Sequence, residues 1–307
     1  MSTTAGTGLG YHQLQRSGPR AIWRPVLGAV ALLVGMVVLA NLITAVAALV
    51  DVVVTGGVPA GTKPLDDPGP VLMAGILLGL SASIPLALAL ARALHGLRPG
   101  FVVSVAGRIR WRYLGGCLGM AVVAMIATMA VASLVPSGTR AELTATPHPF
   151  DGRMLALLVT VGLLTPFQGA AEEVVFRGYL TQAVGSIFPT AVAVVFPALV
   201  FAVLHGFGQS WPVFTDRFAF GLVAGMLVVL TGGLEAGIAM HVVNNWLAFG
   251  FAIVSGNLGE ALQPTDGTWW SLPGTLTQSL VYLGLAVWLA RRQGLATRTG
   301  VRWVPTR

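Results

Sequence analysis

The sequence contains very little charge and almost no cysteine. Only 9% of its 307 residues are charged and 55% are apolar, whereas a soluble protein carries roughly a quarter charged residues. No segment is polar enough to form a soluble domain, so the composition predicts an integral membrane protein. The single cysteine, Cys117, lies in an apolar run and excludes an internal disulfide and a cysteine-based metal cluster. We expect Cys117 to be a small buried residue.

Acidic residues are the scarcer of the two charged classes, and the basic excess gives a net charge of +7. In a membrane protein such an excess indicates orientation in the bilayer rather than binding to nucleic acid. The glycines are scattered, without the spacing of a phosphate-binding loop. We therefore expect a lipid bilayer, and no nucleic acid, around this chain.

Uncharged apolar runs are present instead. A hydrocarbon core about 30 Å thick requires about 20 helical residues. Eight runs meet or approach this length, and they predict an all-α, polytopic membrane helix bundle of about eight transmembrane helices. The runs are residues 25–50, 69–91, 113–139, 154–171, 178–204, 218–234, 236–259 and 267–290.

Arginine is concentrated on one side of this predicted topology. That side holds Arg16, Arg20, Arg24, Arg92, Arg98, Arg108, Arg110, Arg112, Arg291, Arg292, Arg298, Arg302 and Arg307. The opposite loops hold Lys63, Arg140 and Arg153 among Asp66, Asp67, Glu142, Asp151, Glu260 and Asp266. Because positive charge marks the cytoplasmic side, we expect a multi-pass plasma-membrane protein with both termini cytoplasmic.

Polar residues at membrane depth form three clusters, and each ionisable group there needs a partner or a water-filled cavity. They are Glu172, Glu173 and Arg177; then Phe201 and His205; then His241, Asn244 and Asn245. Together they supply the side chains that hydrolysis of an amide requires: a carboxylate base, a histidine that moves a proton, and donors to an oxyanion. No serine lies in the clusters, so a covalent route has little support.

Helical geometry separates the two adjacent acids. Glu173 and Arg177 are four positions apart and share a face, so we expect them to pair. Glu172 is rotated by about 100° from Glu173 and is expected to face a cavity. A helix-end ion network at the interface is the alternative for this cluster. His205 could equally lie at headgroup level, and His241 with Asn245 could hold two helices together.

The remaining ionisable residues are expected to have ordinary roles. Asp216 and Arg217 precede an apolar run and predict an interfacial anchor, and Glu235 predicts a helix cap. His12, His95 and His148 are expected to be solvated in loops.

The motifs Glu172-Glu173-x-x-x-Arg177, Phe201-x-x-x-His205 and His241-x-x-x-Asn245, in this order on separate runs, resemble those of the CAAX protease and bacteriocin-processing family, also called CPBP or Abi. That family includes the eukaryotic endopeptidase that trims prenylated CAAX proteins. The resemblance implies a bundle of eight membrane helices around a water-accessible cavity, and an intramembrane endopeptidase. It also implies that Glu172 activates water with His205, that His241 and Asn245 stabilise the oxyanion, and that Glu173 and Arg177 support them.

On this resemblance the chain divides into four parts. Residues 1–21 form a cytoplasmic tail and residues 22–153 the first three membrane helices with their loops. Residues 154–255 form the catalytic core, and residues 256–307 the last loop, the eighth helix and a basic tail.

The resemblance leaves the cofactor and the substrate open. Members are commonly labelled metalloproteases, and Glu172, His205 and His241 could form a three-ligand zinc site. No helix presents two strong zinc ligands, however, and Asn245 is a better oxyanion donor than zinc ligand, so we favour no cofactor. The expected partner is a peptide or membrane-protein substrate: a prenylated CAAX-like peptide, a leader peptide or a membrane-protein tail. The sequence does not specify the oligomeric state.

Two functions of other classes compete with proteolysis. Buried acids and histidines also form the proton relays of transporters, and a catalytically silent scaffold or immunity factor would need no chemistry at all. Paired half-repeats with broken helices, a common transporter design, are not found in the sequence.

The depth of the site poses a geometric problem. In straight helices Glu172 would lie near the cytoplasmic end of the fourth run and His205 near the far end of the fifth. We expect Pro166 and Pro197 to kink these helices, or residues 174–188 to stay embedded in the bundle.

Overall fold

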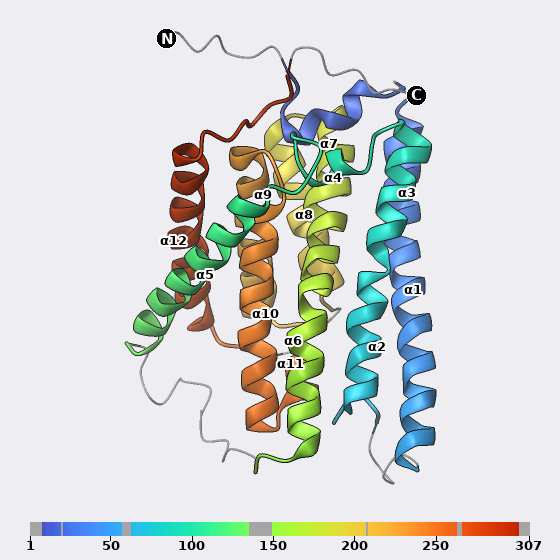
Figure 1. The fold of residues 1–307 in the computed structure, drawn as a ribbon, viewed down its shortest axis with the longest axis vertical. Coiled ribbons are helices and arrows are strands. Elements are labelled where there is room, and N and C mark those ends of the chain that lie inside the picture. Colours follow the sequence, from blue (N-terminus) through green and yellow to red (C-terminus); the bar gives the residue numbers. More distant parts are fainter. Residues whose placement is uncertain are drawn as a thin grey trace.

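The computed structural model describes residues 8–19, 21–56, 63–134, 149–206, 208–262 and 266–300. These residues form a bundle of helices, with no β-strand among them (Figure 1). The predicted all-α membrane bundle is confirmed. His148, Arg20, Arg140, Glu142, Arg302 and Arg307 lie outside the described residues.

The bundle begins with a short 3₁₀ helix and continues through helices of very different lengths. In chain order they are the 3₁₀ helix η1 (Tyr11–Ser17), α1 (Trp23–Thr55), α2 (Pro70–Ser81), α3 (Ser83–His95), α4 (Gly100–Val103), α5 (Trp111–Ala132), α6 (Gly152–Glu172), the π-helix η3 (Glu173–Leu180), α7 (Thr181–Ile187), α8 (Thr190–Leu204), α9 (Trp211–Thr231), α10 (Glu235–Ser255), α11 (Leu258–Leu262) and α12 (Ser271–Arg292).

Seven helical segments of the described chain are long and apolar enough to cross a membrane: residues 23–54, 70–95, 111–131, 152–187, 211–231, 235–255 and 271–292. The protein is therefore a multi-pass membrane protein. The fifth predicted run becomes α8, which is apolar but has only 15 residues. The long segments of the described chain thus number seven, against about eight transmembrane helices expected from the sequence, and α8 is shorter than a span.

The charged motif lies inside one long span, not between two spans as its sequence suggests. Residues 152–187 form a continuous helical segment of 36 residues that passes from α6 through η3 into α7. Every residue of η3 is buried. The charges of Glu173 and Arg177 pair with each other, so this segment needs no turn toward water. Residues 174–183 are thus buried in the bundle, as expected for this stretch, whereas Ile187 and Phe188 are exposed.

Small residues allow close helix packing beside this span. The second span is α2 followed by α3, broken at Ala82. On α2, Gly75 approaches Ala47 of α1, and a Cβ placed on Gly79 would lie 2.9 Å from the carbonyl oxygen of Ala40. Such contacts between small residues let membrane helices pack backbone against backbone.

The described residues near both ends of the chain meet at one end of the bundle (Figure 1). The backbone N–H of Thr299 donates to the carbonyl of Leu9 at 3.0 Å, and the N–H of Leu9 donates to Oγ1 of Thr299 at 3.0 Å. An even number of crossings would produce this arrangement, and α8 has to be counted with the seven long segments to give an even number.

Two of the histidines expected to be solvated are buried, so that prediction is wrong. His12 lies in η1, which packs on α7, and its Nε2 is 3.0 Å from Oγ1 of Thr190. His95 ends α3 with Nε2 3.0 Å from the hydroxyl of Tyr179. Cys117 is fully buried, as predicted.

The expectation that Glu235 only caps a helix is also too narrow. Glu235 begins α10 and accepts two side-chain hydrogen bonds from Arg110, at 2.8 and 2.6 Å. This ion pair fastens the start of α10 to the start of α5.

Candidate active site

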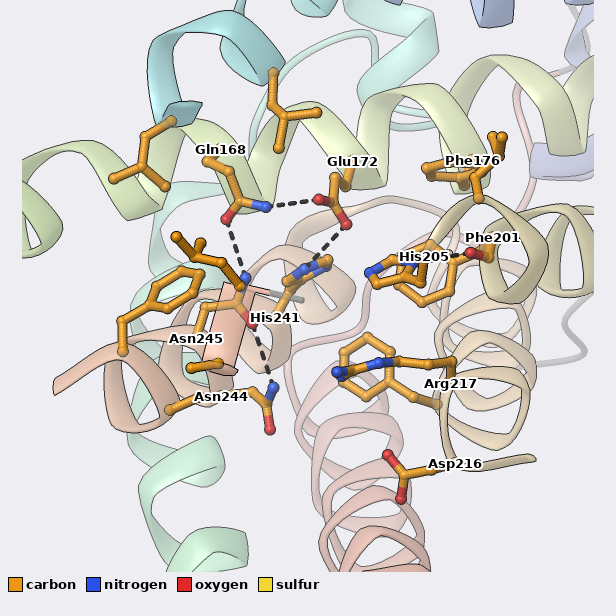
Figure 2. Close-up of a pocket in the computed structure, with 18 of the residues that line it drawn as sticks. Gln168, Glu172, Phe176, Phe201, His205, Asp216, Arg217, His241, Asn244 and Asn245 are labelled. Atoms are coloured by element: carbon orange, nitrogen blue, oxygen red, sulfur yellow. Dashed lines mark hydrogen bonds and ion pairs between the residues drawn. The ribbon is translucent and has the colours of Figure 1, made fainter. Parts of the chain in front are cut away.

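The three motifs converge on one cavity of about 340 Å³ inside the bundle (Figure 2). Its polar lining includes Glu172, His205, His241, Asn244 and Asn245, which come from α6, the end of α8, and α10. Apolar residues of α1, α2 and α11 close other parts of the wall: Met36, Ile76, Leu77, Leu80, Ala261 and Leu262. The sequence therefore predicted residues that the fold brings together.

The predicted pair in η3 is present. Nη1 of Arg177 lies 3.0 Å from Oε1 of Glu173, and both side chains are buried. The Arg177 guanidinium also lies over the ring of Phe201, 4.2 Å from its centroid. A cation over an aromatic face is attracted by the ring quadrupole. The phenylalanine of the second motif thus helps to hold the arginine of the first.

His241 lies between the two adjacent acids. Its Nδ1 is 3.0 Å from Oε1 of Glu173, and its Nε2 is 3.4 Å from Oε2 of Glu172. Glu172 lines the cavity, as expected, and it also lies beside a nitrogen of His241, a contact that the sequence did not predict. The imidazole ring enters from α10 and presents a nitrogen to each carboxylate.

The approach of α10 to Glu173 depends on a glycine. A Cβ placed on Gly237 would lie 2.5 Å from Oε2 of Glu173. Any side chain at this position would displace a carboxylate that already contacts Arg177 and His241. Gly237 therefore sets the distance between α10 and η3.

Gln168 was missed in the sequence, although it connects two of the predicted residues. Its Nε2 donates to Oε1 of Glu172 at 2.6 Å, and its Oε1 accepts from Nδ2 of Asn245 at 3.0 Å. Asn244 in turn donates to Oδ1 of Asn245 at 3.3 Å. The signal was available: Gln168 is a polar residue in an apolar run, one helical turn before Glu172.

His205 follows the last residue of α8 and has one ring nitrogen engaged. Its Nδ1 is 2.8 Å from the carbonyl of Phe201. Because a carbonyl only accepts, Nδ1 carries a proton, and in the neutral ring Nε2 has a free lone pair. Figure 2 shows His205 beside Glu172 and His241. Among the described residues, no hydrogen bond joins His205 to Glu172, although both line the cavity.

In straight helices the sequence would place Glu172 and His205 near opposite sides of the membrane, and the structure removes this conflict. Glu172 does not lie at a helix end, because the span continues to residue 187. Pro166 and Pro197 both lie inside helices, α6 and α8. The short α8 ends at Leu204, so His205 reaches the cavity without crossing to the far side.

Asp216 and Arg217 also line this cavity. They lie within α9, six and seven residues into the helix, and not at its beginning. The prediction of an interfacial anchor for these residues is therefore wrong. Figure 2 shows Arg217 on the same side as His205, across the cavity from Gln168.

The donor set for a metal is limited. Within the described ranges, no group of three or more His, Cys, Asp or Glu side chains is arranged to hold a metal ion. The Nδ1 atoms of His205 and His241 are already engaged, by Phe201 and Glu173. Zinc ligation would use Glu172 and the Nε2 atoms of His205 and His241, because a zinc-bound histidine usually donates its other ring N–H to a neighbour, and no step below is routed through a metal.

Comparison with known proteins bears on the same segment. Residues 153–247 match the family model described as type II CAAX prenyl endopeptidase Rce1-like. We refer to residues 153–247, which are similar to this family, as the Rce1-like region. All three motifs lie inside this Rce1-like region, and the family is one of proteases.

One curated relative extends the similarity beyond the region. The chain is 29% identical over 153 residues to the uncharacterized protein YyaK of Bacillus subtilis (strain 168), covering 46% of this chain and 50% of the relative. The chain thus spans about half the length of the curated relative it matches. No solved structure gives a significant match.

Proposed function

We propose that this protein is an intramembrane endopeptidase that hydrolyses a peptide bond with water activated by Glu172 and His205. The observation that carries the proposal is the convergence of Glu172, His205, His241 and Asn245 on one cavity of the Rce1-like region. All four residues are ordered by further contacts to Gln168, Glu173 and Phe201.

In the proposed reaction, water attacks the carbonyl carbon of the scissile amide. Glu172 accepts the proton that the water loses, and Nε2 of His205 accepts a hydrogen bond from the same water. The new C–O bond places negative charge on the carbonyl oxygen. Collapse of this intermediate breaks the C–N bond, and Glu172 returns the proton to the leaving amine. The products are a carboxylate and an amine.

The oxyanion donors would be Asn245 and His241. The amide nitrogen of Asn245 has two hydrogens and gives one to Gln168, so a second remains for the substrate. His241 donates from Nε2 only as an imidazolium, since Glu173 occupies Nδ1. Donors fixed before the reaction stabilise the developing charge most effectively.

The substrate class follows from the family description and the position of the site. A prenylated CAAX-like peptide is the first candidate, with leader peptides and membrane-protein tails as the others. We propose that the reaction uses no metal, that Glu173 and Arg177 have supporting roles, and that zinc at Glu172, His205 and His241 is the alternative.

The test is peptide release by the purified protein and by Glu172→Gln, followed by mass spectrometry. Glu172→Gln preserves the side-chain shape but removes the base, so we expect a folded protein with hydrolysis reduced at least ~10²-fold. Wild-type rates in Glu172→Gln would refute the proposal. Activity lost on chelation and restored by zinc would support the metal alternative. Ion flux without peptide release would indicate a transporter.

Glu173→Gln provides the companion measurement. This change leaves the buried Arg177 without a charged partner and should cost roughly 3–5 kcal/mol of stability. Because Glu173 also contacts His241, we expect turnover per folded molecule to fall as well, but less than in Glu172→Gln. Melting curves in detergent and cleavage rates separate the two effects. A stable, fully inactive Glu173→Gln protein would reverse the assigned roles.

A further inference from the structure

Arg217 is a cation inside a membrane span, and among the described residues it lacks an ion-pair partner. Its Nε is buried without a hydrogen bond, and no ion pair to Arg217 is found in the part of the chain that the structure describes. The other arginines buried in the bundle contrast with it, since Arg110 pairs with Glu235 and Arg177 with Glu173. A charge at membrane depth needs a counter-charge or water, and is by default part of a functional site.

The neighbouring acid interacts with Arg217 electrostatically but does not form a direct ion pair with it among the described residues. Asp216 lines the same cavity, but it forms no ion pair with Arg217 within the described residues, and its Oδ1 is also buried without a partner. Adjacent helical residues project about 100° apart. The guanidinium of Arg217 therefore remains available to a molecule in the cavity.

The position of Arg217 relates that molecule to the proposed reaction. Figure 2 shows Arg217 next to His205, facing the space bounded by Gln168, His241 and Asn244. The rest of a molecule bound to Arg217 by one group would extend directly toward Glu172 and His205. A guanidinium presents paired N–H donors whose geometry matches the two oxygens of a carboxylate.

We propose that Arg217 is the carboxylate-binding residue of this cavity. The ligand is a peptide that carries a carboxylate close to the bond presented to Glu172, either the free C-terminus or an acidic side chain. The proposal rests on the proposed function for the identity of the ligand as a substrate, whereas binding of the carboxylate itself needs no catalysis.

Binding is measured with three small peptides on the full-length protein in detergent. They are N-acetyl-leucyl-leucine, its C-terminal amide, and N-acetyl-leucyl-aspartate amide. We expect the wild type to bind the free acid more tightly than the amide. In Arg217→Gln this preference should fall by about 10- to 100-fold, the effect of one charge-assisted hydrogen bond. Arg217→Lys retains the charge but not the paired N–H donors, so its preference for the free acid should be intermediate.

A matched control is Arg112→Gln, because Arg112 is exposed and does not line the cavity. This variant should keep the wild-type preference. Tight binding of the aspartate amide would identify an acidic side chain as the source of the carboxylate, and weak binding would identify the C-terminus. Equal binding of the acid and the amide by the wild type overturns the proposal. If Arg217→Gln does not fold, Arg217→Lys is compared instead, and a preference for the acid equal to that of the wild type also overturns it.

Repeating the binding measurement in Glu172→Gln separates the two proposals. A carboxylate preference that depends on Arg217 and persists in Glu172→Gln, together with a wild-type protein that releases no peptide, would support this site and contradict the peptidase. Glu172-dependent cleavage at equal rates for acid and amide peptides would support the peptidase and overturn the role of Arg217.

Discussion

The imidazole of His241 is held at both nitrogens, and this fixes the orientation of the ring. Glu173 contacts Nδ1 and Glu172 faces Nε2, while Phe220 packs edge-on at 5.4 Å between ring centroids. Three side chains thus leave the ring little freedom to rotate. Such preorganisation is what a donor to a transition state requires.

Gln168 is predicted to be a positioning residue for Glu172 and Asn245. Gln168→Met keeps the length of the side chain but removes the hydrogen bonds to both partners. We expect cleavage to fall by about tenfold, the effect of one or two lost hydrogen bonds, with the melting temperature nearly unchanged. Gln293→Met, outside the cavity, is the control and should cleave normally.

A double variant distinguishes a positioning role of Gln168 from a merely structural one by the loss of cleavage. Combined with Asn245→Ala, Gln168→Met should cost less than the sum of the separate losses, because both changes break the same contact. Strictly additive losses would contradict a positioning role.

The sequence predicts local pairs better than contacts between helices. The Glu173–Arg177 pair follows from the helical period alone. The contact of Glu172 with His241 depends on how α10 packs against α6 and η3. No helical periodicity relates two residues that lie 69 positions apart in the sequence. Arg217 was misplaced for a related reason: a charge near the start of an apolar run resembles an anchor unless the helix is known to begin earlier.

At the scale of elements, π-helix η3 replaces an ordinary turn at the point of highest charge density. Single π-turns inside α-helices are frequently found at functional sites. The hydroxyl of Thr181 donates to the carbonyl of Phe176, five residues earlier, at 2.9 Å. This contact satisfies a backbone acceptor beside η3, where the usual helical ladder is displaced.

Close packing of α1 against α2 predicts an intolerant glycine. A methyl group on Gly79 would meet the backbone of Ala40 at 2.9–3.0 Å, and backbone atoms cannot move aside. Gly79→Ala should therefore lower stability by roughly 1–3 kcal/mol. Gly119 on α5 has nothing within 4 Å of the same position, so Gly119→Ala should be neutral or stabilising by about 0.5–1 kcal/mol.

Thermal melting of both glycine variants in the same detergent measures the difference. Equal melting temperatures would mean that α1 and α2 can separate without cost.

The docking of η1 on α7 is predicted to depend on pH. Burial, together with the nearby charges of Arg16 and Arg298, lowers the pKa of His12 from 6.5. Between the lowered folded value and 6.5, the unfolded chain binds more protons, so the free energy of unfolding rises with pH in that window. Docking should be complete above about pH 6.5 and weaken as the pH falls below it.

Melting curves from pH 7.5 to 5 test this prediction against His12→Gln, which can still bond to Thr190 but does not titrate. The variant should lose less stability over that range. Identical pH dependence in the two proteins would remove His12 as the cause.

Element boundaries were less predictable than element number. Seven spans and the shorter α8 account for the eight apolar runs, but residues 172–177 looked like a break because charged residues usually mark membrane exits. Pairing inside the bundle removes that signal, and only the tertiary structure shows it. The length of α8 was overestimated because residues 178–187, which looked like its first part, belong to the preceding span.

At the scale of the whole molecule, the charges divide between the two ends of the bundle. The end of the bundle where η1 and α4 lie also holds the start of α1 and the ends of α3 and α12 (Figure 1). These segments, with the chain next to them, carry Arg16, Arg24, Arg92, Arg98, Arg108, Arg110, Arg112, Arg291, Arg292 and Arg298. The other end has Lys63 and Arg153 among acidic residues, with Arg153 paired to Asp67 at 2.7 Å. We propose that the arginine-rich end faces the cytoplasm.

Cysteine labelling in a Cys117→Ala background tests this orientation. Thr297 and Asp66 are both exposed, at opposite ends of the bundle. An impermeant reagent should label Asp66→Cys in intact cells and Thr297→Cys only after permeabilisation. The reverse pattern would invert the protein in the membrane and move the proposed site to the other compartment.

The contact between Leu9 and Thr299 sets an order of events during synthesis. The two residues are 290 positions apart, and a ribosome adds roughly 5–20 residues per second. Leu9 must therefore wait about 15–60 s for its partner at that rate. During this delay the helices that carry Glu172 and His241 can already have entered the bilayer. The two ends would close around a bundle that is otherwise assembled, as the last step in the maturation of the protein.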